Sequence, residues 1–170
     1  LIGEPFTTNR TFYDVVRHEG RSLLATDGLA VVSDGDAGPE LVVLVEDGGG
    51  RGLAVEGETL FAANLIFGLN AYDLADVDAP ELVATFDENL SIEALDVRGG
   101  IILTGGTDTG LVRIDATDPE AMTITGTTGE STIRDVRFIR DGLALAAADD
   151  EGVLVVGDAC ATRDLKSGDT

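Results

Sequence analysis

The chain has 170 residues, of which 44% are hydrophobic, and its mean hydropathy is +0.16. This length and composition fit one globular domain with a buried core and argue against disorder. The chain has 11 basic and 32 acidic residues, so the formal charge is −21 and the pI is near 4.1. Because binding of nucleic acid or anionic lipid depends on Lys and Arg, neither is expected to be a main partner of so acidic a chain.

Two kinds of marker recur along the chain with one common period. Glycines that open an apolar run occur 40, 42 and 42 residues apart, at Gly28, Gly68, Gly110 and Gly152. Pro-Glu pairs occur 41 and 39 residues apart, beginning at Pro39, Pro80 and Pro119. Self-similarity at about 40 residues with several short strands per unit is typical of propeller blades, whereas helical repeats of like length would show a 3.6-residue period.

Each unit contains short apolar runs separated by Gly, Asp, Asn or Pro, which is the pattern of antiparallel strands. In the second unit the four runs are residues 53–55, 59–63, 69–72 and 82–86. Sheets that are apolar on both faces must stack on one another, as blades do around an axis. We therefore predict an all-β fold, a β-propeller of about four four-stranded antiparallel blades.

The last unit departs from the pattern after three predicted strands, at residues 136–139, 143–147 and 153–156. Residues 1–4 resemble the fourth-strand run of other units, so the N-terminus is one candidate for the missing strand. It would close a four-blade ring and remove two exposed sheet edges. The alternative is that the chain is an arc of a larger propeller.

The predicted propeller domain spans residues 1–158, and residues 159–170 are expected to form a polar C-terminal tail. The predicted repeat units are residues 12–50, 51–91, 92–132, and 133–158 plus 1–6. With no initiating Met and no signal peptide, the chain is expected to be a processed or excised part of its protein.

Two segments carry a resemblance to a known repeat family. Residues 110–119 read Gly-Leu-Val-Arg-Ile-Asp-Ala-Thr-Asp-Pro, and residues 68–73 read Gly-Leu-Asn-Ala-Tyr-Asp, with Ala-Pro-Glu-Leu at 79–82. These segments resemble LVIVD repeats, in which a Gly-Leu-x-x-x-Asp strand leads to an Asp-Pro turn and an outer strand. The first unit departs by placing Ser33 before Asp34, and the last unit has no Asp-Pro turn. The resemblance implies a β-propeller in a surface or secreted protein of bacteria or archaea, without catalytic residues common to the family.

The junctions between units are the candidate binding site. If the first strand of each unit is innermost, these junctions form the mouth of a central channel. The candidate residues are Tyr13, Arg51, Glu93 and Arg134, together with Asp87, Glu88 and Glu130 just before the next unit begins. A ring of Tyr, Arg and carboxylates on rigid strands is suited to ligand binding, because propeller loops converge there. The alternative is that these polar residues are simply hydrated, with Arg paired to Glu across the mouth.

Little in the sequence indicates catalysis or a bound metal. The acidic turns at residues 34–36 and 73–78 superficially resemble calcium loops, but Asp in turns more often accepts hydrogen bonds from nearby backbone N–H groups. The single His18, at an expected exposed strand end, and the single Cys160, an expected idle thiol, provide neither a multi-histidine site nor a disulfide. We predict no catalytic residues and no cofactor, with calcium as the open alternative.

Three classes of function remain. The preferred one is a non-enzymatic scaffold that binds protein or glycan in the cell envelope or outside the cell. The second is a calcium-dependent propeller hydrolase of the lactonase type, and the third is a structural segment that packs on further blades of its own protein or of another copy. No apolar run reaches about 18 residues, so membrane insertion is not expected. The charge also predicts that folding depends on salt. So acidic a chain fits either a halophilic source or an acidic envelope protein.

Overall fold

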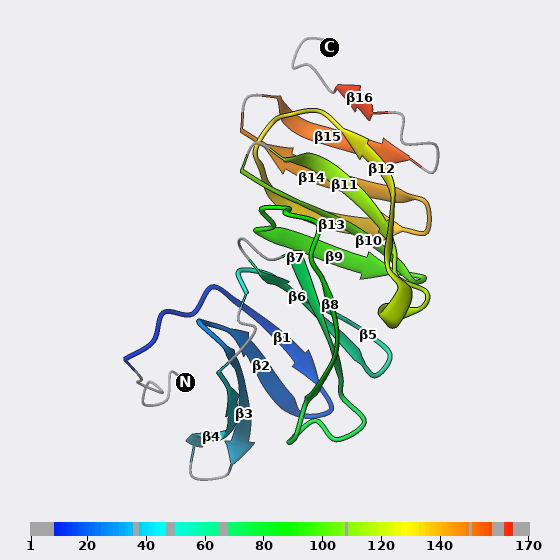
Figure 1. The fold of residues 1–170 in the computed structure, drawn as a ribbon. Helices are drawn as coiled ribbons and strands as arrows, with labels where there is room; N and C mark the ends of the chain where they lie inside the picture. Colours follow the sequence, from blue (N-terminus) through cyan, green and yellow to red (C-terminus); the bar gives the residue numbers. More distant parts are fainter. Residues whose placement is uncertain are drawn as a thin grey trace.

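The computed structural model describes residues 9–35, 38–46, 50–64, 68–107, 109–149, 151–157 and 162–164, with the backbone alone at residues 34 and 162–164. These residues form four antiparallel sheets of four strands each, and the strands of each sheet pair in chain order (Figure 1). The predicted all-β class and the four four-stranded antiparallel sheets are therefore confirmed.

The first sheet consists of β1 (Asp14–His18), β2 (Arg21–Ala25), β3 (Leu29–Gly35) and β4 (Gly38–Val45). The second consists of β5 (Leu53–Glu56), β6 (Thr59–Asn64), β7 (Gly68–Asp73) and β8 (Glu81–Phe86). The third consists of β9 (Ala94–Arg98), β10 (Ile101–Gly106), β11 (Gly110–Asp115) and β12 (Thr123–Thr128), with the short 3-10 turn η1 (Pro119–Ala121) before β12. The fourth consists of β13 (Ile133–Arg140), β14 (Leu143–Ala148), β15 (Gly152–Gly157) and β16 (Thr162–Asp164).

The repeated glycines lie at the start of the third strand of each sheet or directly before it. At Gly28, Gly68 and Gly110 the backbone leaves no room for a side chain, and Gly152 has a φ of +79°. Gly68 has a φ of +81°, and a Cβ on it would lie 1.9 Å from the carbonyl oxygen of Phe86 in β8. Gly110 has a φ of +67°, and its Cβ would lie 2.3 Å from the carbonyl oxygen of Gly129. Only glycine tolerates both the left-handed conformation and so close an approach. This explains the period of the glycines in the sequence.

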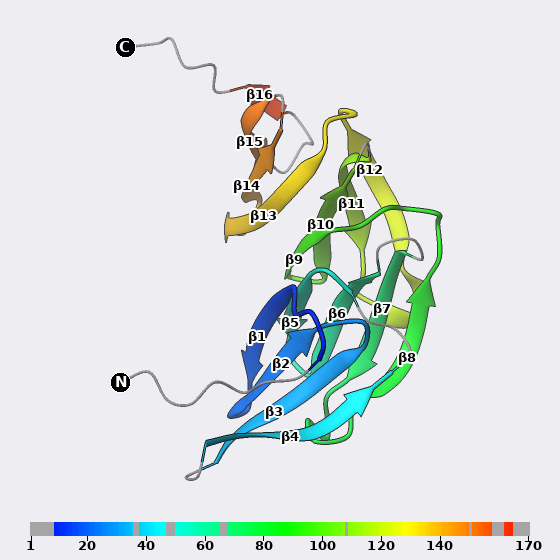
Figure 2. The ribbon, with the colours of Figure 1, turned by 90° about the vertical axis from the view of Figure 1, so that its left-hand side faces the viewer.

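The four sheets follow one another along an arc, with the first sheet at one end and the fourth at the other (Figure 2). Their first strands contact one another in chain order, β1 with β5, β5 with β9 and β9 with β13. The fourth strands β4, β8 and β12 lie on the outer side of the arc in the same view. The first strands are thus the inner ones, the condition on which the predicted mouth depends.

The apolar core is divided into three layers, each between two neighbouring sheets. Leu23 and Leu29 of the first sheet belong to one layer with Leu53, Leu60 and Tyr72 of the second. Phe61 and Leu69 of the second sheet belong to the next layer with Leu95, Ile102 and Ile114 of the third. Leu103 and Leu111 of the third sheet complete the last layer with Val136, Leu154 and Val156 of the fourth. The interior sheets thus bury apolar residues on both faces, as expected for stacked sheets.

The fourth sheet has a fourth strand from its own end of the chain. β16 pairs with β15 through Thr162 opposite Val156, Arg163 opposite Val155 and Asp164 opposite Leu154. The expectation that the last unit lacks this strand is therefore wrong, as is the assignment of residues 162–164 to a tail. An edge strand is held by backbone hydrogen bonds, which the polar sequence Thr-Arg-Asp provides as well as an apolar one would. Residues 1–6, the predicted substitute, lie outside the described residues.

Candidate functional site

One pocket gathers residues from the beginnings of all four sheets. Its volume is about 270 Å³, and its lining includes the four predicted junction residues Tyr13, Arg51, Glu93 and Arg134. These residues come from four different repeat units, so the fold brings together side chains that are separated by about forty positions in the sequence. The pocket lies at the junctions where the mouth is predicted, and we call this pocket the mouth.

The backbone holds three of these residues in equivalent ways. In each case the N–H donates to the carbonyl oxygen of the residue twelve positions further on. The pairs are Tyr13 with Ala25 at 3.0 Å, Arg51 with Ala63 at 2.8 Å, and Glu93 with Gly105 at 2.9 Å. These bonds lie beside the ladder between the first and second strands, so they fix each side chain to the rigid part of its sheet.

Arg51 stacks on Tyr13 across the junction of the first two sheets. Its guanidinium carbon lies 4.6 Å from the centroid of the tyrosine ring, a cation–π contact. Within the described part of the chain, this ring is the one partner of the Arg51 guanidinium, and both side chains are exposed. A guanidinium carries five N–H donors, and the face of a ring occupies none of them in a directed hydrogen bond. Arg51 therefore has hydrogen-bonding capacity at the mouth that none of the described residues uses.

Arg134 is held between two carboxylates. Its Nε and Nη2 donate to Oδ1 and Oδ2 of Asp149 at 2.9 and 2.6 Å, and its Nη1 lies 3.5 Å from Oε2 of Glu93. The hydrogen bonds from Arg134 hold the pKa of Asp149 below its usual value, and Asp149 in turn raises the pKa of Arg134. Glu93 also accepts a hydrogen bond from the Thr107 hydroxyl at 3.0 Å. The Arg–Glu pairing considered as the alternative reading of the mouth thus occurs at Arg134.

Three further charged residues, which were not predicted, also line the pocket: Asp14, Asp135 and Arg137. Both aspartates accept hydrogen bonds from backbone N–H groups, Asp14 from Leu53 of the next sheet at 2.8 Å and Asp135 from Val136 at 2.9 Å. The recurring Asp-Val pair in the first strands was the signal that could have identified them. Three arginines and three carboxylates therefore line the pocket, against 11 basic and 32 acidic residues in the whole chain.

The other three candidate residues do not line this pocket. Asp87 and Glu88 are exposed beyond the end of β8, and Glu130 is exposed beyond the end of β12. Asp87 instead accepts a hydrogen bond of 3.5 Å from the backbone N–H of Asn89. Since β8 and β12 are outer strands, residues that directly follow them are still far from the inner strands in their sheets.

The acidic turn at residues 73–78 is built by hydrogen bonds to its own backbone. Asp73 Oδ1 accepts from the N–H of Ala75 at 2.9 Å, and Asp76 Oδ1 accepts from the N–H of Asp78 at 3.0 Å. The turn interpretation is therefore confirmed here, while the side chains of the turn at 34–36 lie outside the described residues. Within the described ranges, no three His, Cys, Asp or Glu side chains are grouped so as to hold a metal ion.

The single histidine is less exposed than the sequence suggests. His18 ends β1 as expected, but it is half-buried, and its Nε2 atom is buried without a hydrogen-bond partner in the described part of the chain. Cys160 lies outside the described residues. No helix among the described residues is long and apolar enough to cross a membrane.

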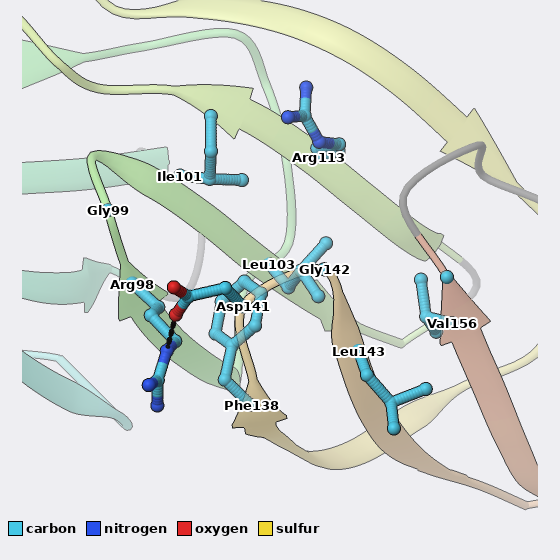
Figure 3. Close-up of a pocket in the computed structure, with 11 residues that line it drawn as sticks. Arg98, Gly99, Ile101, Leu103, Arg113, Phe138, Asp141, Gly142, Leu143 and Val156 are labelled. Atoms are coloured by element: carbon cyan, nitrogen blue, oxygen red, sulfur yellow. Dashed lines mark hydrogen bonds and ion pairs between the residues drawn. The ribbon is translucent and has the colours of Figure 1, made fainter.

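A second cavity, of about 300 Å³, lies between the third and fourth sheets (Figure 3). Figure 3 shows Arg98 and Asp141 pointing toward one another at its edge, where an ion pair holds the pKa of Asp141 below its usual value. Its wall includes Arg113, which occupies the register position of Val31 and Ala71 in the first two sheets, both fully buried. An arginine among apolar equivalents was a signal that comparison of the repeats could have found.

Comparison with known proteins places the fold but not a family. No protein-family model and no curated protein sequence matches the chain, so the resemblance to LVIVD repeats stays a prediction. The chain is similar to the crystal structure of the computationally designed Ika4 protein, at 12% identity and a TM-score of 0.71, over 92% of this chain and 99% of that one. It is also similar to the computationally designed Ika8 protein, at 12% identity and a TM-score of 0.70, over 93% of this chain and 49% of that one. The chain thus spans about half the length of Ika8, and the likeness concerns the fold alone.

Proposed function

We propose that the four sheets are blades of a β-propeller, and that the chain is a non-enzymatic module that binds a carboxylate-bearing ligand at its mouth. The stacking of four-stranded sheets with their first strands inward and their fourth strands outward supports the propeller, since blades pack in this way around an axis. The ligand is an acidic glycan or an acidic segment of a protein. A place in the cell envelope or outside the cell stays a prediction from the sequence.

The observation that carries the proposal is the state of Arg51. Its guanidinium stacks on Tyr13 and has no carboxylate partner among the described residues, although the chain holds 32 acidic residues. A planar guanidinium matches a carboxylate in a two-point hydrogen-bonded geometry. The neighbouring tyrosine ring adds an apolar face with a polar end, which suits a sugar ring or a side chain attached to that carboxylate.

The carboxylates of the mouth favour binding over metal-assisted hydrolysis. Asp14 accepts hydrogen bonds at both oxygens, from the N–H of Val15 and that of Leu53, each at 2.8 Å. Glu93 is engaged by Thr107 and Arg134. Carboxylates that are committed to backbone groups and arginine would have to give up these partners in order to bind calcium.

Titration calorimetry with two probes, an oligogalacturonate and a glutamate-rich peptide of the same charge, tests the proposal. We expect one of them to bind and Arg51→Ala to weaken that binding by about tenfold or more, because charge-assisted hydrogen bonds are lost. The matched control is Arg140→Ala, which removes the same charge from an exposed residue at the far end of β13. Equal weakening by both variants, or failure of both probes to bind the unaltered chain, would contradict the proposal.

A further inference from the structure

The face of the first sheet that points away from the second sheet is exposed at a position that is buried in the other three sheets. The first-strand residues Leu53, Leu95 and Val136 are no more than 2% exposed, whereas Val15, at the same register position in β1, is 56% exposed. Leu24, the cross-strand partner of Val15, is also only half-buried. The exposed apolar part of this face belongs to the two inner strands, since Ala30 of β3 is buried.

The fourth sheet shows the complementary exposure on its opposite face. Leu29, Leu69 and Leu111 directly follow the repeated glycines and are no more than 3% exposed, whereas Val153, the equivalent residue in β15, is 46% exposed. Ala147, its partner on β14, is exposed as well, although its equivalent Ala63 is fully buried. The two ends of the arc thus each present apolar residues that the interior of the arc buries.

These two positions share an apolar layer wherever two sheets stack. Each of the three layers contains the residue that follows the repeated glycine in the earlier sheet and the residue at the register position of Val15 in the later sheet. The pairs are Leu29 with Leu53, Leu69 with Leu95, and Leu111 with Val136. By the same register, Val153 is the earlier member of a fourth pair and Val15 is the later member.

We infer that the fourth sheet of one copy docks on the first sheet of a second copy, so that two copies close a ring of eight sheets. The partner face comes from another copy because the first and fourth sheets of one chain lie at opposite ends of the arc in both views (Figures 1 and 2). Such a contact joins two different surfaces, and it closes when the rotation per copy completes a ring. Eight sheets lie within the range of about 4–8 blades known for propellers.

The likeness to designed proteins supports this size of ring. The chain matches one half of the Ika8 structure at a TM-score of 0.70, so the same arrangement of four sheets occurs in a structure of about twice the length. The charge of −21 on each copy opposes their association. At about 1 M salt the Debye length is about 3 Å, and this repulsion is largely screened.

The solution mass in about 1 M NaCl, measured by light scattering behind size exclusion, tests the inference. We expect twice the 17.6 kDa of one chain, and the mass of a single chain for Val15→Asp and for Val153→Asp. The matched control is Val83→Asp. Val83 is 40% exposed, but it lies on β8 of the second sheet and so on neither of the two proposed docking faces. This variant should keep the double mass. Circular dichroism establishes that each variant is folded. A single-chain mass for the unaltered protein, or loss of the double mass in the control, would overturn the inference.

Cross-linking distinguishes two copies from a ring closed within one chain. In a Cys160→Ser background, Val15→Cys and Val153→Cys are made in separate chains, mixed, and treated with a short bis-maleimide. We expect a covalent pair of chains from this mixture, and much less from a mixture of the Val15→Cys and Val83→Cys chains. A third chain carries both Val15→Cys and Val153→Cys. If only this chain reacts, and the product is a single chain linked internally, the ring closes without a second copy and the inference is wrong.

Discussion

Arg21 of the first sheet and Asp78 of the second form a two-point ion pair, with Nε donating to Oδ1 at 2.6 Å and Nη2 to Oδ2 at 2.8 Å. Arg21 begins β2, beside the end of β1 that is opposite Tyr13, and Asp78 lies in the turn between β7 and β8. The hydrogen bond from Arg21 lowers the pKa of Asp78. This pair ties two neighbouring sheets at the end away from the mouth.

Asp78→Asn should lower the melting temperature at neutral pH, because the Asn cannot form the ion pair. A carboxylate with a lowered folded-state pKa stabilises the fold above its ordinary value of 3.8, and this contribution is lost as the pH falls through the lower folded-state value. The difference in melting temperature between the variant and the unaltered chain should therefore shrink below pH 3.8. The control is Glu81→Gln, a carboxylate exposed on β8. A difference that stays constant from pH 7 to strongly acidic pH would contradict this reading.

Glu56→Gln should destabilise the contact between the second and third sheets. The two carboxylate oxygens of Glu56 accept from the N–H groups of Gly99 and Gly100, at 2.5 and 2.6 Å, in the turn between β9 and β10. An amide would present its NH₂ group to one of these donors, so we expect a loss of about 1–3 kcal/mol in the free energy of unfolding. The control is Glu58→Gln, which makes the same charge change on an exposed side chain in the turn between β5 and β6. Urea denaturation of both variants measures the difference, and equal effects would refute the role of Glu56.

Leu69→Ala should lower the free energy of unfolding by about 2–5 kcal/mol, because a fully buried leucine leaves a cavity when it is truncated. Leu69 lies in the layer between the second and third sheets, against residues that cannot easily move to fill the space. Val83→Ala, on the exposed face of β8, should cost less than about 0.5 kcal/mol. Chemical denaturation of the two variants compares them, and similar losses would mean that this layer does not pack as described.

Salt should raise the melting temperature, since a formal charge of −21 opposes the compact state and is screened as ionic strength increases. Differential scanning fluorimetry over a series of NaCl concentrations measures the effect. CaCl₂ at the same ionic strength should raise the melting temperature no more than NaCl does, because the turn carboxylates already accept backbone hydrogen bonds. A rise at micromolar calcium would instead indicate a specific calcium site.

The sequence predicted the repeat, the four strands of the second sheet and the first three strands of the fourth sheet, because each depends on a local constraint. Gly68 and Gly110 are required by positive φ angles and by close contact with the next strand, so their spacing reports the repeat directly. The strand β16 escaped prediction because Thr162, Arg163 and Asp164 carry no apolar pattern. Its pairing depends on a neighbouring edge rather than on its own side chains.

The mouth was predicted in part for a similar reason. Tyr13, Arg51 and Glu93 hold the same place in the repeat, so knowing the phase was enough to bring them together. Asp87 and Glu130 were wrongly assigned to the lining because closeness in sequence to a first strand does not place a residue beside it in space. The hydrogen bond from Leu53 to Asp14 joins two sheets, and the Asp-Val pair that recurs in the first strands is the only trace of its acceptor in the sequence.

Among the described residues, the side-chain hydrogen bonds and ion pairs between sheets join only neighbouring sheets. Asp14 accepts from Leu53 in the second sheet, and in the same way Asp96 in the third accepts from Phe138 in the fourth at 2.7 Å. A chain of units coupled only to their neighbours loses its end members first, so amide hydrogens should exchange fastest in the first and fourth sheets and slowest in β6 and β10. Only an open arc has end sheets that can fray in this way. In a ring of two copies every sheet has a neighbour on each side, and the protection of β1 and β15 would then depend on protein concentration.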